Sequence, residues 1–229
     1  MDKDLTRYLD DLPLIAILRG IHPYECLDIG HTLFEIGFRL IEIPLNSPDP
    51  FKSIKKLAFD LNGKALIGAG TIFHKKHLQI LSDTGGKLAV MPHSDLELIR
   101  KAKSLNLICI PGVASPSEAI ASLNAGADAL KVFPAEMIVP RVLKAWKSVL
   151  PEGTKLFPVG GILPSLMSSY LDAGATGFGL GSALYLPGQT VKDVQANGKT
   201  FFKCWKKLEI RMRKHTCPLI IVSLCNANY

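Results

Sequence analysis

The sequence predicts an α/β protein built as a single (β/α)8 barrel, and two observations lead to this fold class. Short aliphatic or β-branched runs recur eight times at fairly even spacing, with segments of helical periodicity between them. The similar segments Leu123–Asp128 and Leu171–Thr176 also lie 48 residues apart, which fits two strand–helix units between them. Eight units in little more than 200 residues favour a closed barrel over an open doubly wound sheet.

The predicted strands begin with an apolar run near the N-terminus and continue to the last quarter of the chain. In order they are 14–18, 40–43, 65–67, 88–91, 107–110, 129–133, 156–159 and 177–180. Proline at the first turn and glycine after the last turn mark the ends of the intervening helices. The prolines are Pro23, Pro116, Pro140 and Pro164, and the glycines are Gly37, Gly85, Gly126 and Gly174.

Composition excludes several classes of protein. Of 229 residues, 48% are hydrophobic and 21% are charged, which excludes intrinsic disorder. The five cysteines form no C-x-x-C pair, so we expect free thiols in a reducing, cytoplasmic location. The acidic N-terminal segment lacks a secretory pattern, and no apolar run approaches the roughly 20 residues that span a bilayer.

The net charge of +7 is spread over helix-like segments without interleaved aromatic residues. This pattern argues against nucleic-acid binding and suits an anionic small substrate. We expect residues 1–208 to form the barrel with a short N-terminal lead-in. Residues 209–218 lack a clear apolar face and residues 219–224 form an isolated hydrophobic patch, so the segment 209–229 is predicted to be an appendix to the barrel.

Polar side chains at the C-terminal ends of strands are the candidates for chemistry, because TIM-type barrels carry their active sites there. Four such residues are Arg19, Glu42, Thr71 and Lys131. Strand side chains alternate between faces, so Glu42 and Lys131 should both point into the barrel while their neighbours face the helices.

A buried lysine beside a carboxylate has two interpretations. One is a structural ion pair, since an unpaired buried charge is costly. The other is catalytic: an ammonium without hydration loses proton affinity, and the resulting amine can attack a carbonyl and form a Schiff base. Glu42 could then transfer protons.

A second cluster consists of glycine-rich loops after the seventh and eighth predicted strands. These are Val159–Ile162 and Gly179–Ser182. Loops at these positions commonly bind phosphate through backbone N–H groups and helix N-termini. The sequence therefore predicts a phosphorylated carbonyl compound as substrate. His74 and His77 lack further ligands nearby, so we predict no metal site and no cofactor.

Taken together, the motifs resemble those of the 2-keto-3-deoxy-6-phosphogluconate and -galactonate aldolases over roughly residues 12–208. The matching segments, in family order, are Ala16–Gly20, Glu42–Ser47, Ile67–Thr71, Ala129–Pro134 and Val159–Ile162. The resemblance implies a homotrimeric, metal-independent class I aldolase that releases pyruvate and glyceraldehyde 3-phosphate from a phosphorylated 2-keto-3-deoxy sugar acid.

The resemblance also implies roles for individual residues. Lys131 would be the Schiff-base lysine and Glu42 the acid/base carboxylate. The pyruvate carboxylate would be held by Arg19 and Thr71, with Pro92 lining the same pocket. The 6-phosphate would lie against Gly160, Gly161, Gly181 and Ser182.

The galactonate branch is favoured over the gluconate branch. Arg19 and the Glu42–Ser47 segment look like the galactonate enzymes, and so does Val159 before the glycine pair. Two departures from the family pattern, His93 and the loop 134–140, lie near the expected substrate entrance. Two further hypotheses stay open: a phosphosugar isomerase or epimerase, which needs no imine, and a phosphosugar-binding barrel without activity.

Overall fold

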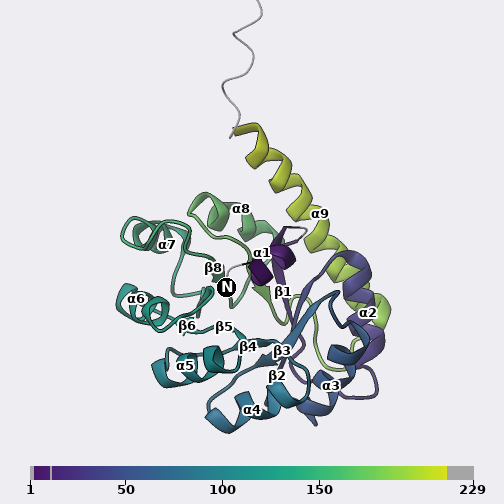
Figure 1. Cartoon of the computed structure of the whole chain (residues 1–229). Helices are drawn as coiled ribbons and strands as arrows, with labels where there is room; N and C mark the ends of the chain where they lie inside the picture. Colours follow the sequence, from purple (N-terminus) through teal and green to yellow (C-terminus); the bar gives the residue numbers. More distant parts are fainter. Residues whose placement is uncertain (1–2, 11, 216–229) are drawn as a thin grey trace, which may run out of the picture.

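The computed structural model describes residues 3–10 and 12–215, and in it helices surround a curled set of parallel strands (Figure 1). The helices are α1 Lys3–Leu9, α2 Cys26–Ile36, α3 Pro50–Asp60, α4 Lys75–Asp83, α5 Leu96–Ser104, α6 Pro116–Asn124, α7 Pro140–Lys147, α8 Pro164–Asp172 and α9 Val191–His215. The strands are β1 Leu14–Ile17, β2 Leu40–Pro44, β3 Leu66–Gly70, β4 Leu88–Val90, β5 Ile108–Ile110, β6 Gly112–Val113, β7 Leu130–Val132, β8 Leu156–Pro158 and β9 Phe178–Leu180.

All pairings between these strands are parallel, which confirms the predicted α/β class. One sheet has the order β5-β4-β3-β2-β1-β9 and the other β6-β7-β8. Strand β5 lies within the fifth predicted strand, 107–110. A further short strand, β6, was not predicted; it follows Pro111, which has no N–H to donate and separates the two strands. Val159, just after β8, forms a parallel bridge with Gly179 in β9.

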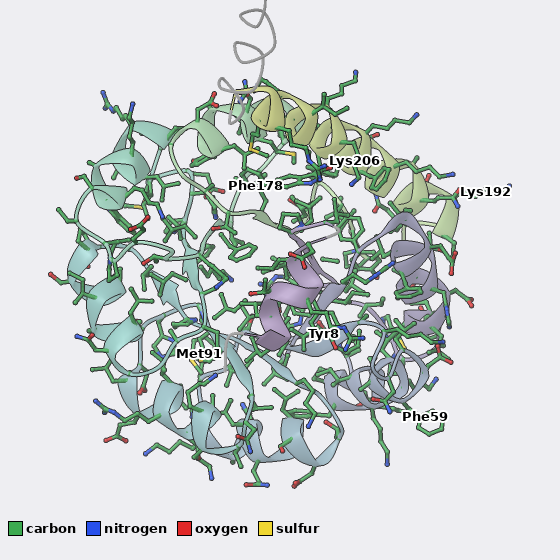
Figure 2. All side chains as sticks on the ribbon, turned by 45° about the horizontal axis from the view of Figure 1, so that its top comes forward. Tyr8, Phe59, Met91, Phe178, Lys192 and Lys206 are labelled. Atoms are coloured by element: carbon green, nitrogen blue, oxygen red, sulfur yellow. The ribbon has the colours of Figure 1, made fainter. Side chains whose placement is uncertain are left out.

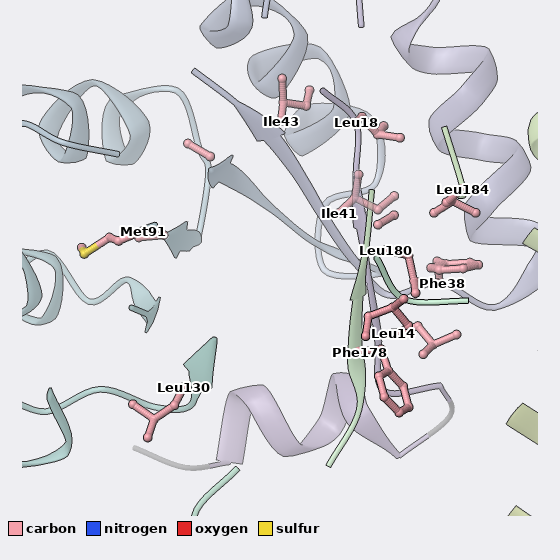
Figure 3. Close-up of a cluster of buried hydrophobic side chains, with 14 of the residues drawn as sticks. Leu14, Leu18, Phe38, Ile41, Ile43, Met91, Leu130, Phe178, Leu180 and Leu184 are labelled. Atoms are coloured by element: carbon pink, nitrogen blue, oxygen red, sulfur yellow. The ribbon is translucent and has the colours of Figure 1, made fainter. Parts of the chain in front are cut away.

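Two hydrophobic clusters lie on opposite faces of the strands. The larger one packs between strands and helices and includes Val132 as well as Ile41, Ile43 and Leu130, which Figure 3 labels. The smaller one lies inside the curled sheet and includes Leu40 and Ala129 together with other strand residues. The predicted alternation of inward and outward side chains in β2 and β7 is therefore confirmed.

Helix α1 lies over the centre of the ring of helices in Figure 2. Its Leu5 and Leu9 are 1% and 8% exposed and belong to the inner cluster with Ile15 of β1. The N-terminal lead-in is thus a helix that covers one end of the strand interior. In the part of the chain that the structure describes, no helix has both the length and the apolar character needed to cross a membrane.

The predicted helix ends are mostly correct. Pro116, Pro140 and Pro164 stand at the first turns of α6, α7 and α8. All four predicted glycines have positive φ, which a side chain disfavours. Pro23 is a wrong prediction, because α2 begins only at Cys26. Pro50 at the start of α3 fits the same rule.

The C-terminal segment is helical as far as the structure describes it. Helix α9 runs through the expected boundary at residue 208, and Arg211 donates hydrogen bonds to Ser168 and Asp172 of α8. Residues 209–215 therefore continue α9 and contact α8. The rest of that segment, 216–229, lies outside the described residues.

Candidate active site

Lys131 is the central residue of β7, and its side chain is only 5% exposed. Its Nζ lies 4.8 Å from the centroid of the Phe133 ring. Burial lowers the pKa of Lys131 below its ordinary value of 10.5, the Glu42 carboxylate raises it, and the Arg19 guanidinium lowers it. Loss of hydration outweighs the attraction of the carboxylate, so the amine form is more accessible than in a lysine exposed to water.

Glu42 projects from β2 into the same interior and is 1% exposed. Burial raises the pKa of its carboxyl group, whereas Lys131 and Arg19 lower it. Its Oε2 atom is buried without a hydrogen-bond partner. An unpaired buried oxygen is costly, and such atoms in native proteins call for a functional explanation. Here the oxygen is available to accept a proton.

Gly70, the last residue of β3, creates the space for this carboxylate. A Cβ built on Gly70 would stand 1.4 Å from Oε2 of Glu42. Gly70 is paired with Pro44 in the parallel ladder, so its position is fixed by the sheet. Gly70 belongs to the Ile67–Thr71 segment, but the sequence pattern predicted no role for it. The sequence did contain one signal for this role, because a glycine within a strand often lies where another group comes very close to the backbone.

Arg19 follows β1 and is held by a residue that follows β2. Its Nη1 donates a hydrogen bond of 2.6 Å to Oδ1 of Asn46. Next to it, the Gly20 N–H donates to the Ser47 hydroxyl at 2.9 Å. The segment after Glu42 therefore orients the loop that carries Arg19. Asn46 and Ser47 belong to the Glu42–Ser47 segment, but no pattern in the sequence predicted these two contacts.

A cavity of about 260 Å³ opens at the C-terminal ends of β1, β7, β8 and β9. Seven of the ten predicted site residues line it, namely Arg19, Lys131, Val159, Gly160, Gly161, Gly181 and Ser182. Both glycines of the first loop have positive φ, 112° and 60°. The two glycine-rich loops and the buried lysine therefore share one cavity.

The remaining three predicted residues are not part of the lining. Glu42 is covered by the backbone of Gly70 and lies close enough to Lys131 for their charges to interact. Thr71 has φ of 58°, a strained conformation for a β-branched residue, directly after β3. Pro92 follows β4 and is half-buried. Thr71 and Pro92 follow parallel strands and so lie at the same edge of the sheet as the cavity.

Glu136 is a cavity residue that sequence analysis missed. It lies in the loop 134–140, which departs from the family pattern, but no spacing in the sequence shows where its side chain points. In the structure its carboxylate lies beside Gly160 and Gly161.

Comparison with known proteins extends these observations. The model of the family described as KDPG and KHG aldolase matches residues 5–198. The 2-dehydro-3-deoxy-6-phosphogalactonate aldolase of Escherichia coli (strain K12) is 42% identical over 196 residues, which cover 86% of this chain and 96% of that protein.

Solved structures show the same relationship. A structure described as "Native KDPGal structure" is 41% identical, covers 87% of this chain and 97% of its own, and gives a TM-score of 0.85. A KDPG aldolase from Legionella pneumophila, solved with pyruvate captured as a covalent carbinolamine intermediate, is 26% identical, with coverages of 88% and 96% and a TM-score of 0.72. This chain belongs to the KDPG and KHG aldolase family.

Proposed function

We propose that the chain is a class I aldolase that cleaves 2-dehydro-3-deoxy-6-phosphogalactonate into pyruvate and D-glyceraldehyde 3-phosphate. The observation that carries the proposal is the buried pair of Lys131 and Glu42, with one carboxylate oxygen left unpaired. The Escherichia coli relative that bears this name is 42% identical over 196 residues, whereas the 2-dehydro-3-deoxy-phosphogluconate aldolase of Zymomonas mobilis is 32% identical over 172 residues.

In the first step, the neutral Lys131 amine attacks the C2 carbonyl carbon of the keto acid. The carbinolamine that forms loses water and becomes an iminium ion, the protonated Schiff base. The lowered pKa of Lys131 supports this step, because a larger fraction of the lysine is present as a free amine.

In the second step, Glu42 accepts the proton of the C4 hydroxyl group. The C3–C4 bond breaks, its electron pair passes to the iminium to form an enamine, and the aldehyde leaves. A proton is then added to C3, and hydrolysis of the imine releases pyruvate and restores the amine. Since the unpaired Oε2 has no competing donor among the described residues, it can accept this proton.

The remaining predicted residues are assigned to binding. The guanidinium of Arg19, which is held by Asn46, suits the pyruvate carboxylate, with Thr71 beside it and Pro92 at the same edge of the sheet.

The other binding residues are assigned to the rest of the substrate. Val159 adjoins C4 of the substrate. The backbone of Gly160, Gly161 and Gly181 and the hydroxyl of Ser182 line the part of the cavity that we assign to the 6-phosphate.

We also propose that the strands close into one (β/α)8 barrel. Support comes from the short interruption between β5 and β6 and from the Val159–Gly179 bridge between the two sheets. The division into a barrel of 1–208 and a further C-terminal segment stays a prediction. The homotrimer also stays a prediction, which rests on the family resemblance, and so does the cytoplasmic location, which rests on the cysteine pattern and the acidic N-terminal segment. Sedimentation velocity tests the trimer by its mass.

Trapping with borohydride tests the covalent step. In the presence of pyruvate, borohydride should fix a reduced adduct on Lys131, located by peptide mass spectrometry. The Lys131→Ala variant should give no adduct, while Lys144→Ala, which changes an exposed lysine of α7, should behave like the wild type. An unmodified Lys131 in the wild type contradicts the proposal and favours an isomerase or a non-catalytic phosphosugar-binding protein.

A coupled lactate dehydrogenase assay tests the substrate. Pyruvate release should be faster from the galactonate derivative than from its C4 epimer, the gluconate derivative. The reverse order would assign the chain to the alternative substrate. Binding of both sugar acids without pyruvate release would identify a binding protein.

A further inference from the structure

We infer, on the basis of the proposed function, that a hydrogen bond between Tyr185 and Glu25 fixes the distance between the two ends of the cavity. The carboxylate end is the loop that carries Arg19, and the phosphate end is the turn 181–185, which carries Ser182. Tyr185 and Glu25 are then positioning residues. Their hydrogen bond should matter for a substrate that contacts both ends and should be dispensable for pyruvate, which contacts only the carboxylate end.

Tyr185 belongs to the phosphate end, in the turn that follows β9. Its backbone N–H donates a hydrogen bond of 3.0 Å to the carbonyl of Gly181, and the Leu184 N–H donates to the same carbonyl at 2.8 Å. Gly181 and Ser182 lie within this turn and line the cavity. Tyr185 is only 2% exposed, so packing holds its ring in place. The Tyr185 hydroxyl therefore has a fixed position relative to Ser182.

Glu25 belongs to the carboxylate end, in the loop that runs from Arg19 to the start of α2. Its Oε1 atom accepts a hydrogen bond of 2.9 Å from the His22 N–H, which closes the loop on itself. The Pro23 carbonyl accepts a hydrogen bond of 2.6 Å from Nζ of Lys56 in α3, which fixes the loop to a neighbouring helix. The Glu25 carboxylate is consequently part of a well-supported loop.

The two ends meet through this carboxylate. The Tyr185 hydroxyl donates a hydrogen bond of 3.2 Å to the same Oε1 atom of Glu25. Burial and the Glu25 carboxylate both raise the pKa of Tyr185, so the phenol keeps its proton and remains a donor. A second contact lies nearby: a Cβ built on Gly20, the residue after Arg19, would stand 2.6 Å from Cγ of Pro187. The segment after the turn thus packs closely on the loop.

A fixed distance between the ends affects only a ligand that contacts both. If the ends can move apart, binding of such a ligand must also order them, and this ordering costs conformational entropy. The cost applies to the bound substrate and to the transition state alike, so KM should rise while kcat changes little. Pyruvate carries no phosphate, and its capture on Lys131 needs only the carboxylate end.

Steady-state kinetics with the phosphorylated sugar acid test the inference. Tyr185→Phe removes the hydrogen bond and keeps the buried ring, so KM should rise about tenfold, as for loss of a hydrogen bond to a charged group, with kcat nearly unchanged. Glu25→Ala should raise KM at least as much. Glu25→Gln keeps an acceptor oxygen and should lie closer to the wild type than Glu25→Ala. Tyr24→Phe, which removes a hydroxyl from an exposed residue of the same loop, is the matched control and should leave KM unchanged.

Trapping with pyruvate separates positioning from a general loss of structure. The rate of borohydride modification of Lys131 is measured over a range of pyruvate concentrations. The pyruvate concentration that gives half of the maximal rate should be the same in the wild type, Tyr185→Phe and Glu25→Ala. A disturbed fold would instead weaken the binding of pyruvate and of the phosphorylated acid together. Should Tyr185→Phe fail to fold, Glu25→Ala and Glu25→Gln provide the same comparison.

Three results would overturn the inference: an unchanged KM in Tyr185→Phe, equal weakening toward pyruvate and the phosphorylated acid, or a Glu25→Gln variant no better than Glu25→Ala. Failure of the proposed aldolase function is distinguishable from all three. In that case the wild type itself would release no pyruvate and would form no borohydride adduct on Lys131, whereas failure of the positioning role leaves the wild-type activity intact.

Discussion

The buried carboxylate of Glu42 and the missing side chain of Gly70 form one functional unit. A carboxylate that is 1% exposed can keep an unpaired oxygen only if neighbouring atoms leave it room. Gly70 provides that room on the adjacent strand, and its φ is not in the left-handed region. The glycine is therefore required for space rather than for backbone conformation.

Substitution of Gly70 tests this relationship. The new methyl group of Gly70→Ala would overlap the carboxylate and displace it from Lys131, so we expect kcat to fall by about 10²-fold, as for loss of an acid/base group. Urea unfolding should show that the fold persists. In a Glu42→Ala background the same change should have no further effect on kcat, since the displaced group is already absent. If Gly70→Ala lowered kcat in the Glu42→Ala background as much as in the wild type, Gly70 would act through a group other than Glu42.

The pKa of Lys131 should respond in opposite directions to its two charged neighbours. The Glu42 carboxylate raises this pKa, so Glu42→Gln should lower it; Arg19 lowers it, so Arg19→Met should raise it. Competitive labelling with acetic anhydride across a pH series reports the amine fraction at Lys131 and needs no substrate. The midpoint should move to lower pH in the first variant and to higher pH in the second. Shifts in one common direction would contradict the assignment.

At the scale of elements, α1 illustrates how a short helix stabilises the interior. Its seven residues are too few for an isolated helix to be stable in water, so packing must hold it in place. Leu5 and Leu9 provide that packing by entering the inner cluster. The helix covers the strand interior at one end, while the C-terminal ends of the strands carry the candidate site.

Truncation of Leu5 tests the contribution of α1. Leu5→Ala should lower the free energy of unfolding by about 2–5 kcal/mol, the range for emptying a buried leucine site. Urea denaturation measures this change. Arg7→Ala, which removes an exposed hydrogen bond to the Gly63 carbonyl, should cost no more than about 1 kcal/mol. Equal effects of the two substitutions would mean that α1 contributes little through burial.

For the whole molecule, the contact between the first and last strands joins distant parts of the chain. A Cβ on Gly177 would stand 1.9 Å from the carbonyl oxygen of Pro13 and 2.8 Å from the Phe157 ring. The same Pro13 carbonyl accepts a hydrogen bond of 3.1 Å from Phe178. Close approach of the backbone at this point allows β9 to pair with β1.

A methyl group at Gly177 should therefore destabilise the whole fold. We expect Gly177→Ala to lower the free energy of unfolding by about 3 kcal/mol, at the upper end of overpacking effects, because a backbone atom cannot move aside. Gly181→Ala is the matched control, since nothing lies within 4 Å of a Cβ built there. Thermal and urea unfolding measure both variants, and similar stability of the two proteins would contradict this account.

Much of the fold was predictable because its signals are local. Alternation placed Leu40 inside the sheet and Ile41 outside it, and the prolines of α6 to α8 were visible at their helix starts. The short strand β6 after Pro111 and the helix α1 were not predicted. The first has only two residues, and the second is stabilised mainly by contacts with distant strands.

The sequence by itself determined most of the strands and helices and that Lys131 and Glu42 face the same interior, since periodicity and turn chemistry act over a few neighbouring residues. Only the tertiary structure decided which side chains meet. It placed Gly70 against Glu42, Asn46 against Arg19, and Glu136 over the Gly160–Gly161 turn. Each of these contacts joins residues 24 or more positions apart, and it depends on strand register and loop path, which no local pattern encodes.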